Sequence, residues 1–363
     1  MEAYLGPLSR LEEVREVVLI RDRADVPVRP KMRVITPPVW WARRTVTKLS
    51  ARSWLLGSEV AVHPPDVVMV VHWFPDGPGV TRLARRLGVP MVANIIGSRA
   101  ELVDGGRKAS LSSLPTLLKR SAEEYLRGHL AATAAVTFTG TATLDWYREA
   151  GVSAPQLSVL HAAMDSERLR PGHGPRDVDV VYVGRVDADK RADRVLRVLA
   201  SLGAARPGTR ATLVGVRQEE VECLPAFADA RAALGNGLEV KGWLADVSAV
   251  MRRSKVLLVT SDSEGRPLAV LESMLCGAVP VATDVGDIGE ALAGGRVGVL
   301  VPHRGAEADL CGRLACETDR LLSNEPWRAE LAAAGRAHVC IEHAPSRTES
   351  EWRRILAGVL STS

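Results

Sequence analysis

The stretch SDSEGRPLAVLESMLCGAVPVATD, Ser261 to Asp284, indicates more about this chain than any other. It follows an apolar run, KVLLV (255–259), which is typical of a buried strand in a parallel sheet. Ligands of an open parallel sheet bind beyond the carboxyl ends of its strands. The two carboxylates of this stretch, Glu264 and Glu272, are therefore expected near the edge of the sheet where a ligand binds.

The residues after this strand predict a helix whose N-terminus lies at the same edge. Pro267 fits the first helical turn and Gly277 the position after the helix end, so we expect a helix over 267–276. The unpaired amides of a helix N-terminus bind anions. Glu264 lies just before this anion site and Glu272 lies about one and a half turns into the helix. Carboxylates accept hydrogen bonds from hydroxyls. The arrangement therefore favours a single ligand in which a diphosphate at the helix N-terminus joins a sugar to a ribose, with one carboxylate near each of the two. The alternative is two solvated surface glutamates.

A second stretch, GRVDADKRADRVLRVLASL (184–202), places two cations at the same edge. It begins where the strand-like run VDVVYV (178–183) ends, so Arg185 and Lys190 lie in a loop between a strand and a helix. Two cations there can neutralise a diphosphate leaving group where no metal does so. Each residue alone would be an ordinary surface cation. The two stretches together, about eighty residues apart, are far more specific.

The composition is that of a reduced globular protein. At 363 residues, with 46% hydrophobic and 25% charged residues, the chain is too long for one ordinary core. Its net charge of +4 comes from scattered arginines and by itself suits an anionic small ligand or a nucleic acid equally. Five dispersed cysteines lack metal-ligand spacing and favour a cytoplasmic location. Because no apolar run approaches ~18 residues, we expect a soluble protein.

Short β-branched runs alternate with helical segments, which indicates α/β domains with doubly wound parallel sheets. A segment rich in Pro and Gly, 168–177, is expected to link two such domains. We predict an N-terminal domain over 1–170, a C-terminal domain over 171–345, and a final helix over 346–361 that packs back on the first domain. The expected strands are 16–20, 32–36, 66–71, 91–96, 134–138, 157–160, 178–183, 211–214, 238–240, 255–259, 279–283 and 297–301.

These stretches resemble the retaining GT-B glycosyltransferases of family 4, the "glycosyl transferases group 1" type. The resemblance covers most of the chain. PDVVMVVHWFPDGPGVTRLARRLGVP (65–90) and GVSAPQLSVLHAAMDSERLRP (151–171) look like the family's first domain. VVYVGRVDADK (180–190) and the opening stretch, extended to Glu290, look like its donor domain. The resemblance implies a GT-B fold, in which two Rossmann-like domains face a central cleft.

The resemblance also implies roles for particular residues. Glu264 would contact the transferred sugar and Glu272 the ribose hydroxyls, while Arg185 and Lys190 would hold the diphosphate. The backbone at KGW (241–243) would touch the base. The full implied donor-binding set is Gly184, Arg185, Lys190, Gly242, Trp243, Glu264, Gly265, Arg266, Pro267, Leu268 and Glu272.

The implied activity is transfer of a sugar from a nucleotide sugar to an acceptor hydroxyl with retention of configuration, in bacterial polysaccharide or small-metabolite glycosylation. The donor is expected to be a UDP-sugar, with a GDP-sugar as the alternative, and neither a cofactor nor a metal is expected. The expected partners are this donor and a hydroxyl acceptor, not a nucleic acid. Two other functions are open: an inactive relative that binds a nucleotide sugar and assists a partner protein, and a nucleotide-sugar epimerase.

The sequence departs from the family pattern at its N-terminus. The family opens with a strand and a glycine loop before a helix, whereas MEAYLGPLSRLEEV (1–14) resembles that helix alone. The strand that would precede it would be the central one of the first sheet, and its loss would leave neighbouring strands with unpaired edges. The expectation is a start site placed too late or a shortened chain.

Further departures affect residues near the reacting sugar. Where relatives carry a histidine before a Gly-Ser pair, this chain has Ile96, followed by Gly97 and Ser98, and Ile96 can take no hydrogen-bonding role. His72, at the end of a neighbouring strand, is a weaker acceptor-side candidate. Arg266 replaces a common aromatic residue and adds a cation. HAAMD (161–165) also differs from the family's usual turn.

The segment PPVWWARRTVTKLSARSWLLG (37–57) predicts a helix with one apolar face. Its other face would carry Trp41, Arg44, Lys48 and Arg52. Three interpretations are open. The basic side chains are merely solvated, or the surface 39–56 makes a peripheral contact with anionic lipid at the inner face of the membrane, or its Trp rings form an acceptor platform.

Overall fold

The computed structural model describes residues 2–20, 30–36, 45–71, 73, 76–97, 116–265 and 267–361. The chain forms two compact units. Unit 1 comprises Met1–Ala163 and Pro345–Ser363, and unit 2 comprises Met164–Ala344. The chain therefore enters unit 2 once and returns to unit 1 for its last helix.

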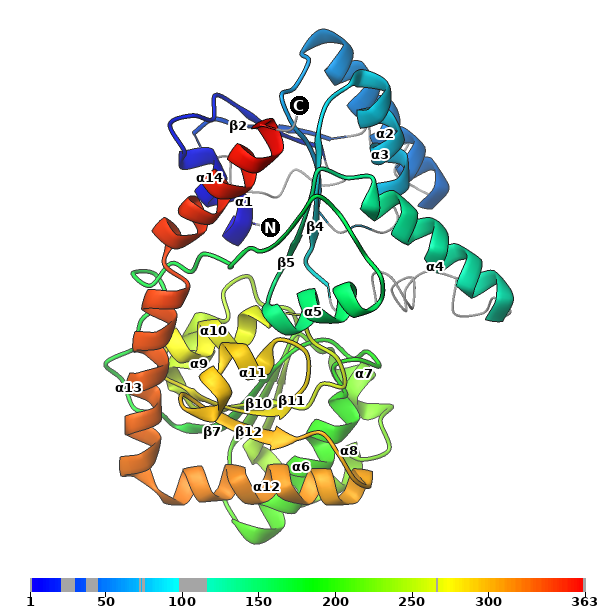
Figure 1. Cartoon of the computed structure of the whole chain (residues 1–363). Coiled ribbons are helices and arrows are strands. Elements are labelled where there is room, and N and C mark those ends of the chain that lie inside the picture. Colours follow the sequence, from blue (N-terminus) through cyan, green and yellow to red (C-terminus); the bar gives the residue numbers. More distant parts are fainter. Residues whose placement is uncertain are drawn as a thin grey trace. The chain divides into compact units, whose positions relative to one another are not determined.

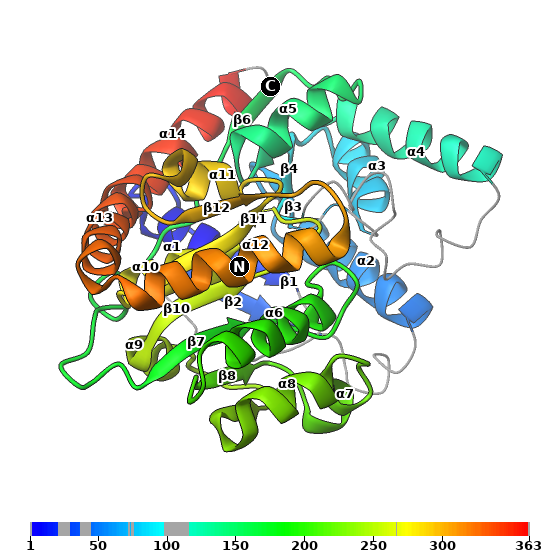
Figure 2. The same cartoon turned by 90° about the horizontal axis from the view of Figure 1, so that it is seen from below.

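Unit 2 contains a six-stranded parallel sheet (Figures 1 and 2). Its spatial order is β12-β11-β10-β7-β8-β9. The chain runs outward from β7 through β8 to β9 and then returns to place β10 on the other side of β7. The carboxyl ends of β7 and β10 therefore flank the point where the strand order reverses, which is where open α/β sheets bind ligands. The strands are β7 (Val178–Val183), β8 (Ala211–Val214), β9 (Leu238–Lys241), β10 (Ser254–Val259), β11 (Val279–Asp284) and β12 (Val299–Pro302).

Helices cover both faces of this sheet because alternate strand residues point to opposite sides. In β10, Val256 and Leu258 pack into the core under one helical layer, while Leu257 and Val259 pack into the core under the other. Figure 1 shows the two layers below and above the strands. The first layer is α6 (Ala192–Ala205), α8 (Phe227–Leu234) and α12 (Glu307–Ser323). The second is α9 (Ser248–Arg253), α10 (Leu268–Leu275), α11 (Ile288–Ala291) and α13 (Glu325–Glu342), and a short helix, α7 (Gln218–Glu222), follows β8.

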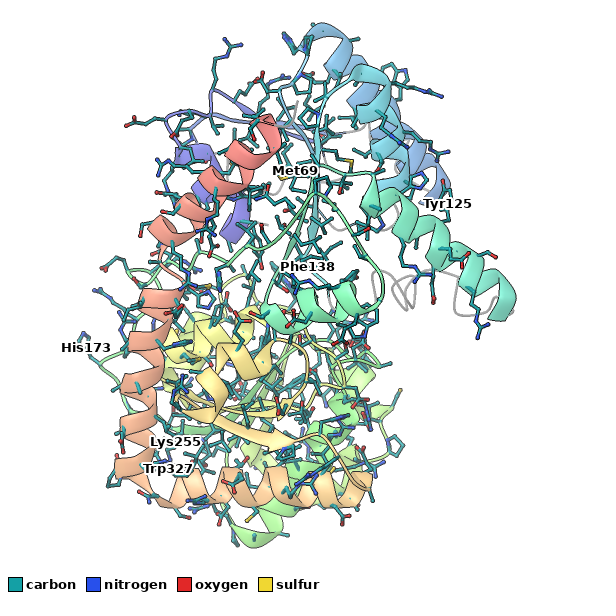
Figure 3. The ribbon with its side chains drawn as sticks, viewed as in Figure 1. Met69, Tyr125, Phe138, His173, Lys255 and Trp327 are labelled. Carbon is teal, nitrogen blue, oxygen red and sulfur yellow. The ribbon has the colours of Figure 1, made fainter. Side chains whose placement is uncertain are left out.

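Unit 1 contains a four-stranded parallel sheet of order β3-β4-β5-β6 and a separate two-stranded parallel sheet, β1-β2. One core of the larger sheet includes Phe138, which Figure 3 labels beside α5, and Tyr147, whose ring contacts it. The strands are β1 (Val17–Ile20), β2 (Met32–Ile35), β3 (Val68–Val71), β4 (Met91–Ile95), β5 (Ala135–Phe138) and β6 (Gln156–Val159). The helices are α1 (Glu2–Arg10), α2 (Thr45–Val62), α3 (Gly77–Leu87), α4 (Thr116–Ala131), α5 (Thr141–Glu149) and α14 (Pro345–Ser361).

All twelve expected strands are present in the described residues, with ends that differ by at most two residues. Two other expectations were wrong. The segment 168–177 is not a linker, because its Leu169 is buried in unit 2 and the guanidinium of Arg176 donates to the carbonyls of Ser254 and Cys276. The helix predicted over 37–57 does not end at Gly57 but continues to Val62, and its last turn buries Val60. Residues 37–44 lie outside the described part.

The last helix, α14, packs beside α1 (Figure 1). Trp352 is fully buried and its indole Nε1 donates to the carbonyl of Tyr4 at 2.8 Å. The side chain of Glu351 accepts from the backbone N–H of His161 at 2.7 Å and lies 2.6 Å from the Nδ1 of that ring. These contacts tie the two ends of unit 1 together, and His161, the first residue of HAAMD, takes part in them.

We therefore expect Trp352→Ala to destabilise unit 1 strongly. Removing a fully buried Trp leaves a cavity and costs about 3–5 kcal/mol. Chemical unfolding followed by circular dichroism measures this loss, and Arg354→Ala, an exposed position on the same helix, serves as the control. Equal stability of the two variants would show that α14 contributes little to unit 1.

Candidate functional site

The loops that follow β7 and β10 meet at the switch point of the unit 2 sheet. Lys190 Nζ lies 2.5 Å from Glu264 Oε1. The hydroxyl of Ser261 donates to the same oxygen at 2.7 Å. Glu264 is only 6% exposed, so this carboxylate is held in place by two donors rather than by solvent. Residues 74 positions apart in sequence are thus brought into direct contact.

The loop after β7 also fixes Arg185 and the backbone of Lys190. The buried hydroxyl of Tyr182 donates to the carbonyl of Arg185 at 2.9 Å. Asp187 accepts from the backbone N–H of Lys190 at 2.8 Å and pairs with the Arg185 guanidinium at 2.9 Å. The Arg185 side chain remains 60% exposed, so it can still reach a ligand at this edge.

The helix after β10 begins one residue later than predicted. Pro267 has ψ of 102° and is the N-cap of α10, not part of its first turn. The amides of Gly265 and Leu268 donate to none of the described residues, and amides at the N-terminus of a helix suit an anion. Arg266, predicted to add a cation here, lies outside the described residues.

Glu272 lies in the second turn of α10, where its side chain is largely buried. Burial raises the pKa of this carboxyl, and the nearby Arg168 only partly offsets the effect. Among the described residues, none forms a hydrogen bond or ion pair with the Glu272 side chain. A desolvated carboxylate without a protein partner is a strong acceptor for the hydroxyls of a bound ligand.

Close backbone approaches shape the rest of this edge. The N–H of Gly184 donates to the carbonyl of Val214 at 3.0 Å, and the N–H of Gly215 donates to the carbonyls of Lys241 and Gly242. Gly215 has φ of 86°, and a Cβ there would lie 2.6 Å from the carbonyl oxygen of Gly184. The loops after β7, β8 and β9 are therefore joined. Trp243, which follows β9, is 81% exposed at this edge.

Comparison with known sequences decides the family. Residues 165–338 match the model of the glycosyl transferases group 1, and residues 8–163 match that of the glycosyl transferase 4-like domain. The chain belongs to the group 1 glycosyltransferases. The expected resemblance to the group 1 glycosyltransferases is thereby confirmed.

Curated relatives of this glycosyltransferase come from bacteria. It is 28% identical to the D-inositol 3-phosphate glycosyltransferase of Nocardiopsis dassonvillei, over 77% of this chain and 68% of the relative. It is also 28% identical to the enzyme of the same name from Frankia alni, over 83% of this chain and 75% of the relative.

Solved structures share the fold of this glycosyltransferase. Sucrose-phosphate synthase from Thermosynechococcus elongatus aligns with a TM-score of 0.77 at 17% identity, covering 96% of this chain and 90% of that one. Anabaena HepE in complex with UDP-glucose aligns with a TM-score of 0.69 at 17% identity, covering 90% and 86%. The expected GT-B class, with two parallel-sheet α/β domains, is confirmed.

The acceptor-side residues predicted for the glycosyltransferase lie largely outside the described part. His72 and Ser98 are in undescribed segments. Gly97 and the partly buried Ile96 follow the carboxyl end of β4, as the sequence predicts. In the surface 39–56, residues 39–44 lie outside the described part and the side chains of 45–53 are not described, although Trp54 on α2 is 59% exposed. Figure 3 shows a second exposed aromatic residue, Tyr125, on α4.

The described residues contain neither a membrane-crossing helix nor a cluster of metal ligands. None of the helices there combines the length and the apolar character that crossing a bilayer requires. No three His, Cys, Asp or Glu side chains there come together as a metal site would need.

Sequence reasoning missed several residues around Glu264. Ser261 binds its carboxylate, and Gly286 approaches its backbone so closely that a Cβ would collide with the Glu264 carbonyl oxygen. Gly286 also has φ of 55°. The position of Gly286 just after a strand was the available signal for a close approach of two backbones. It does not reveal that the loop carrying Glu264 is the one that approaches. Arg191 and Arg194, at the start of α6, also gave no signal, because their partners Asp262 and Glu307 lie far away in sequence.

Proposed function

We propose that this glycosyltransferase transfers a sugar from a nucleoside diphosphate sugar to an acceptor hydroxyl with retention of configuration. The observation that carries the proposal is the contact between Lys190 and Glu264 at the switch point of the unit 2 sheet. The bond that breaks in such a donor joins the sugar to the diphosphate. The groups that bind these two parts must therefore be neighbours, as the Lys190 ammonium and the Glu264 carboxylate are.

The surrounding groups support a donor laid along the carboxyl edge of the sheet. The amides at the start of α10 and the exposed guanidinium of Arg185 supply further positive charge for the diphosphate. The buried carboxylate of Glu272 suits the ribose hydroxyls. Gly242 and Trp243, which follow β9, suit the base. HepE was solved with UDP-glucose, which supports UDP as the nucleotide.

In the proposed reaction, the bond between the anomeric carbon and the phosphate oxygen breaks as the acceptor oxygen bonds to the same face of that carbon. The departing phosphate accepts the proton of the acceptor hydroxyl. Negative charge grows on the diphosphate as the bond breaks, so Lys190 and Arg185 stabilise the transition state more than the ground state. These cations do what a metal does elsewhere, so we propose that the reaction proceeds without one.

The test is a turnover assay with UDP-glucose, UDP-N-acetylglucosamine and GDP-mannose, each with water or D-inositol 3-phosphate as acceptor. The inositol phosphate is included because it is named for two relatives. We expect release of the nucleoside diphosphate from one donor, undiminished by EDTA, and a product with the anomeric configuration of the donor. Conversion of the donor sugar without acceptor would indicate an epimerase. Binding of UDP without turnover of any donor would indicate an inactive binding protein.

A further prediction concerns Glu272. Glu272→Gln is expected to weaken UDP binding about 10-fold or more, because a charge-assisted hydrogen bond to a ribose hydroxyl contributes ~1.5–3 kcal/mol. Titration calorimetry with UDP and with inorganic pyrophosphate separates the causes. The variant should lose affinity for UDP but not for pyrophosphate, which has no ribose. An equal loss for both ligands would contradict a ribose contact.

A further inference from the structure

A cluster of charges around the buried Arg194 links the two donor-side loops to α12. Arg194, on α6, is 2% exposed and its guanidinium donates to Asp262 at 2.8 Å and, through two nitrogens, to Glu307. Arg191 donates to the other oxygen of Asp262 at 2.9 Å and also to Glu307. His303 Nε2 lies 2.9 Å from Asp262. Asp262 therefore has three partners, Arg191 and Arg194 at the start of α6 and His303 after β12.

Asp262 also fastens the loop after β7 to the loop after β10 through the backbone. Its N–H donates to the carbonyl of Asp189 at 2.8 Å. The hydroxyl of Thr260 donates to the carbonyls of Lys190 and Arg191 at 3.2 and 3.0 Å. Asp189 and Arg191, the neighbours of Lys190, are thus hydrogen-bonded to Asp262 and Thr260. Both of these lie within four residues of Glu264 in sequence.

The backbone at Arg191 requires this support. Arg191 has φ of 52° and ψ of 53°, a left-handed conformation that costs a non-glycine residue on the order of 1 kcal/mol or more. Its guanidinium is held by Asp193 as well as by Asp262 and Glu307. The partners of Asp262 outweigh the effect of burial and lower its pKa to about 2, so it stays charged near neutral pH.

We propose that Asp262 and Arg194 are positioning residues, which set the spacing between Lys190 and Glu264 and so aim the Lys190 ammonium at the donor diphosphate. This inference rests on the proposed function, because it assigns the cluster a purpose only if Lys190 acts on a diphosphate. Neither residue is placed to touch the donor itself, since Arg194 is buried and Asp262 is occupied by Arg191, Arg194 and His303.

The test is a double-mutant cycle between Asp262→Asn and Lys190→Ala, read out by UDP affinity in calorimetry and by turnover of UDP-glucose. Asn keeps the size of Asp262 and its backbone bond but removes the charge that pairs with Arg191 and Arg194. Asp262→Asn alone should weaken UDP binding about 3-fold and lower turnover about 10-fold. In the Lys190→Ala background it should change either quantity less than 2-fold, because the ammonium that it positions is absent.

A matched control addresses general destabilisation. Asp319→Asn breaks the pair between Arg206 and α12, at 2.8 Å, which lies outside the cluster. It should lower the melting temperature about as much as Asp262→Asn does but leave UDP affinity and turnover unchanged. Additive effects in the cycle would overturn the positioning role while leaving the proposed function intact. If Lys190→Ala itself changes neither UDP affinity nor turnover, the proposed site is wrong, and the inference fails with it.

Discussion

Gly286→Ala should abolish sugar transfer while the protein still folds. A Cβ at this position would collide with the carbonyl oxygen of Glu264, and the φ of 55° adds strain for any residue other than glycine. The loop that carries Glu264 must shift to relieve the collision. Because a displacement of about 1 Å in a reacting geometry can lower the rate about 100-fold, we expect at least that loss in turnover of the donor.

The control for this prediction is Gly294→Ala. Gly294 also has a positive φ, 68°, but a Cβ there would meet no atom within 4 Å. Both variants carry the cost of the left-handed backbone, and Gly286→Ala adds the cost of the collision. Both melting temperatures should therefore fall, that of Gly286→Ala further, while only Gly286→Ala should lose turnover. Equal activities in the two variants would mean that the position of Glu264 does not control the reaction.

Lys190→Ala should lower turnover about 100-fold and weaken UDP binding only about 10-fold. The ammonium interacts with a diphosphate whose charge is greater in the transition state than in the ground state, so the rate suffers more than the affinity. Steady-state kinetics with UDP-glucose, or with whichever nucleotide sugar is turned over, measures the first quantity, and calorimetry with UDP measures the second.

Lys255→Ala is a closely matched control for Lys190. Lys255, labelled in Figure 3, pairs with Asp179 at 2.7 Å, and its side chain is 29% exposed, against 28% for Lys190. It lies near the start of β10, whereas Lys190 follows the carboxyl end of the neighbouring strand. Both variants break a lysine–carboxylate pair, but only Lys190→Ala should impair the reaction. Comparable loss in both would assign the effect to stability.

The strands and the loops after them could be predicted from the sequence, because their signals are local. Alternating and continuous apolar runs place each strand to within two residues, and Gly277, with φ of 81°, ends α10 as its position indicates. The order of the segments along the chain was enough to predict that Arg185, Lys190 and Glu264 follow the carboxyl ends of strands. The family resemblance then supplied roles that spacing alone left open.

The tertiary structure decided which of these loops meet. No local pattern states that β10 returns to lie beside β7, because strand order depends on how each face of the sheet is buried by distant helices. That return puts Lys190 against Glu264, brings Gly286 against the Glu264 backbone, and gathers Arg191 and Arg194 around Asp262. The buried Arg194 looks ordinary in sequence, since its side-chain partners lie about seventy or more residues away. The sequence determined the groups that the site contains, and long-range packing determined their distances.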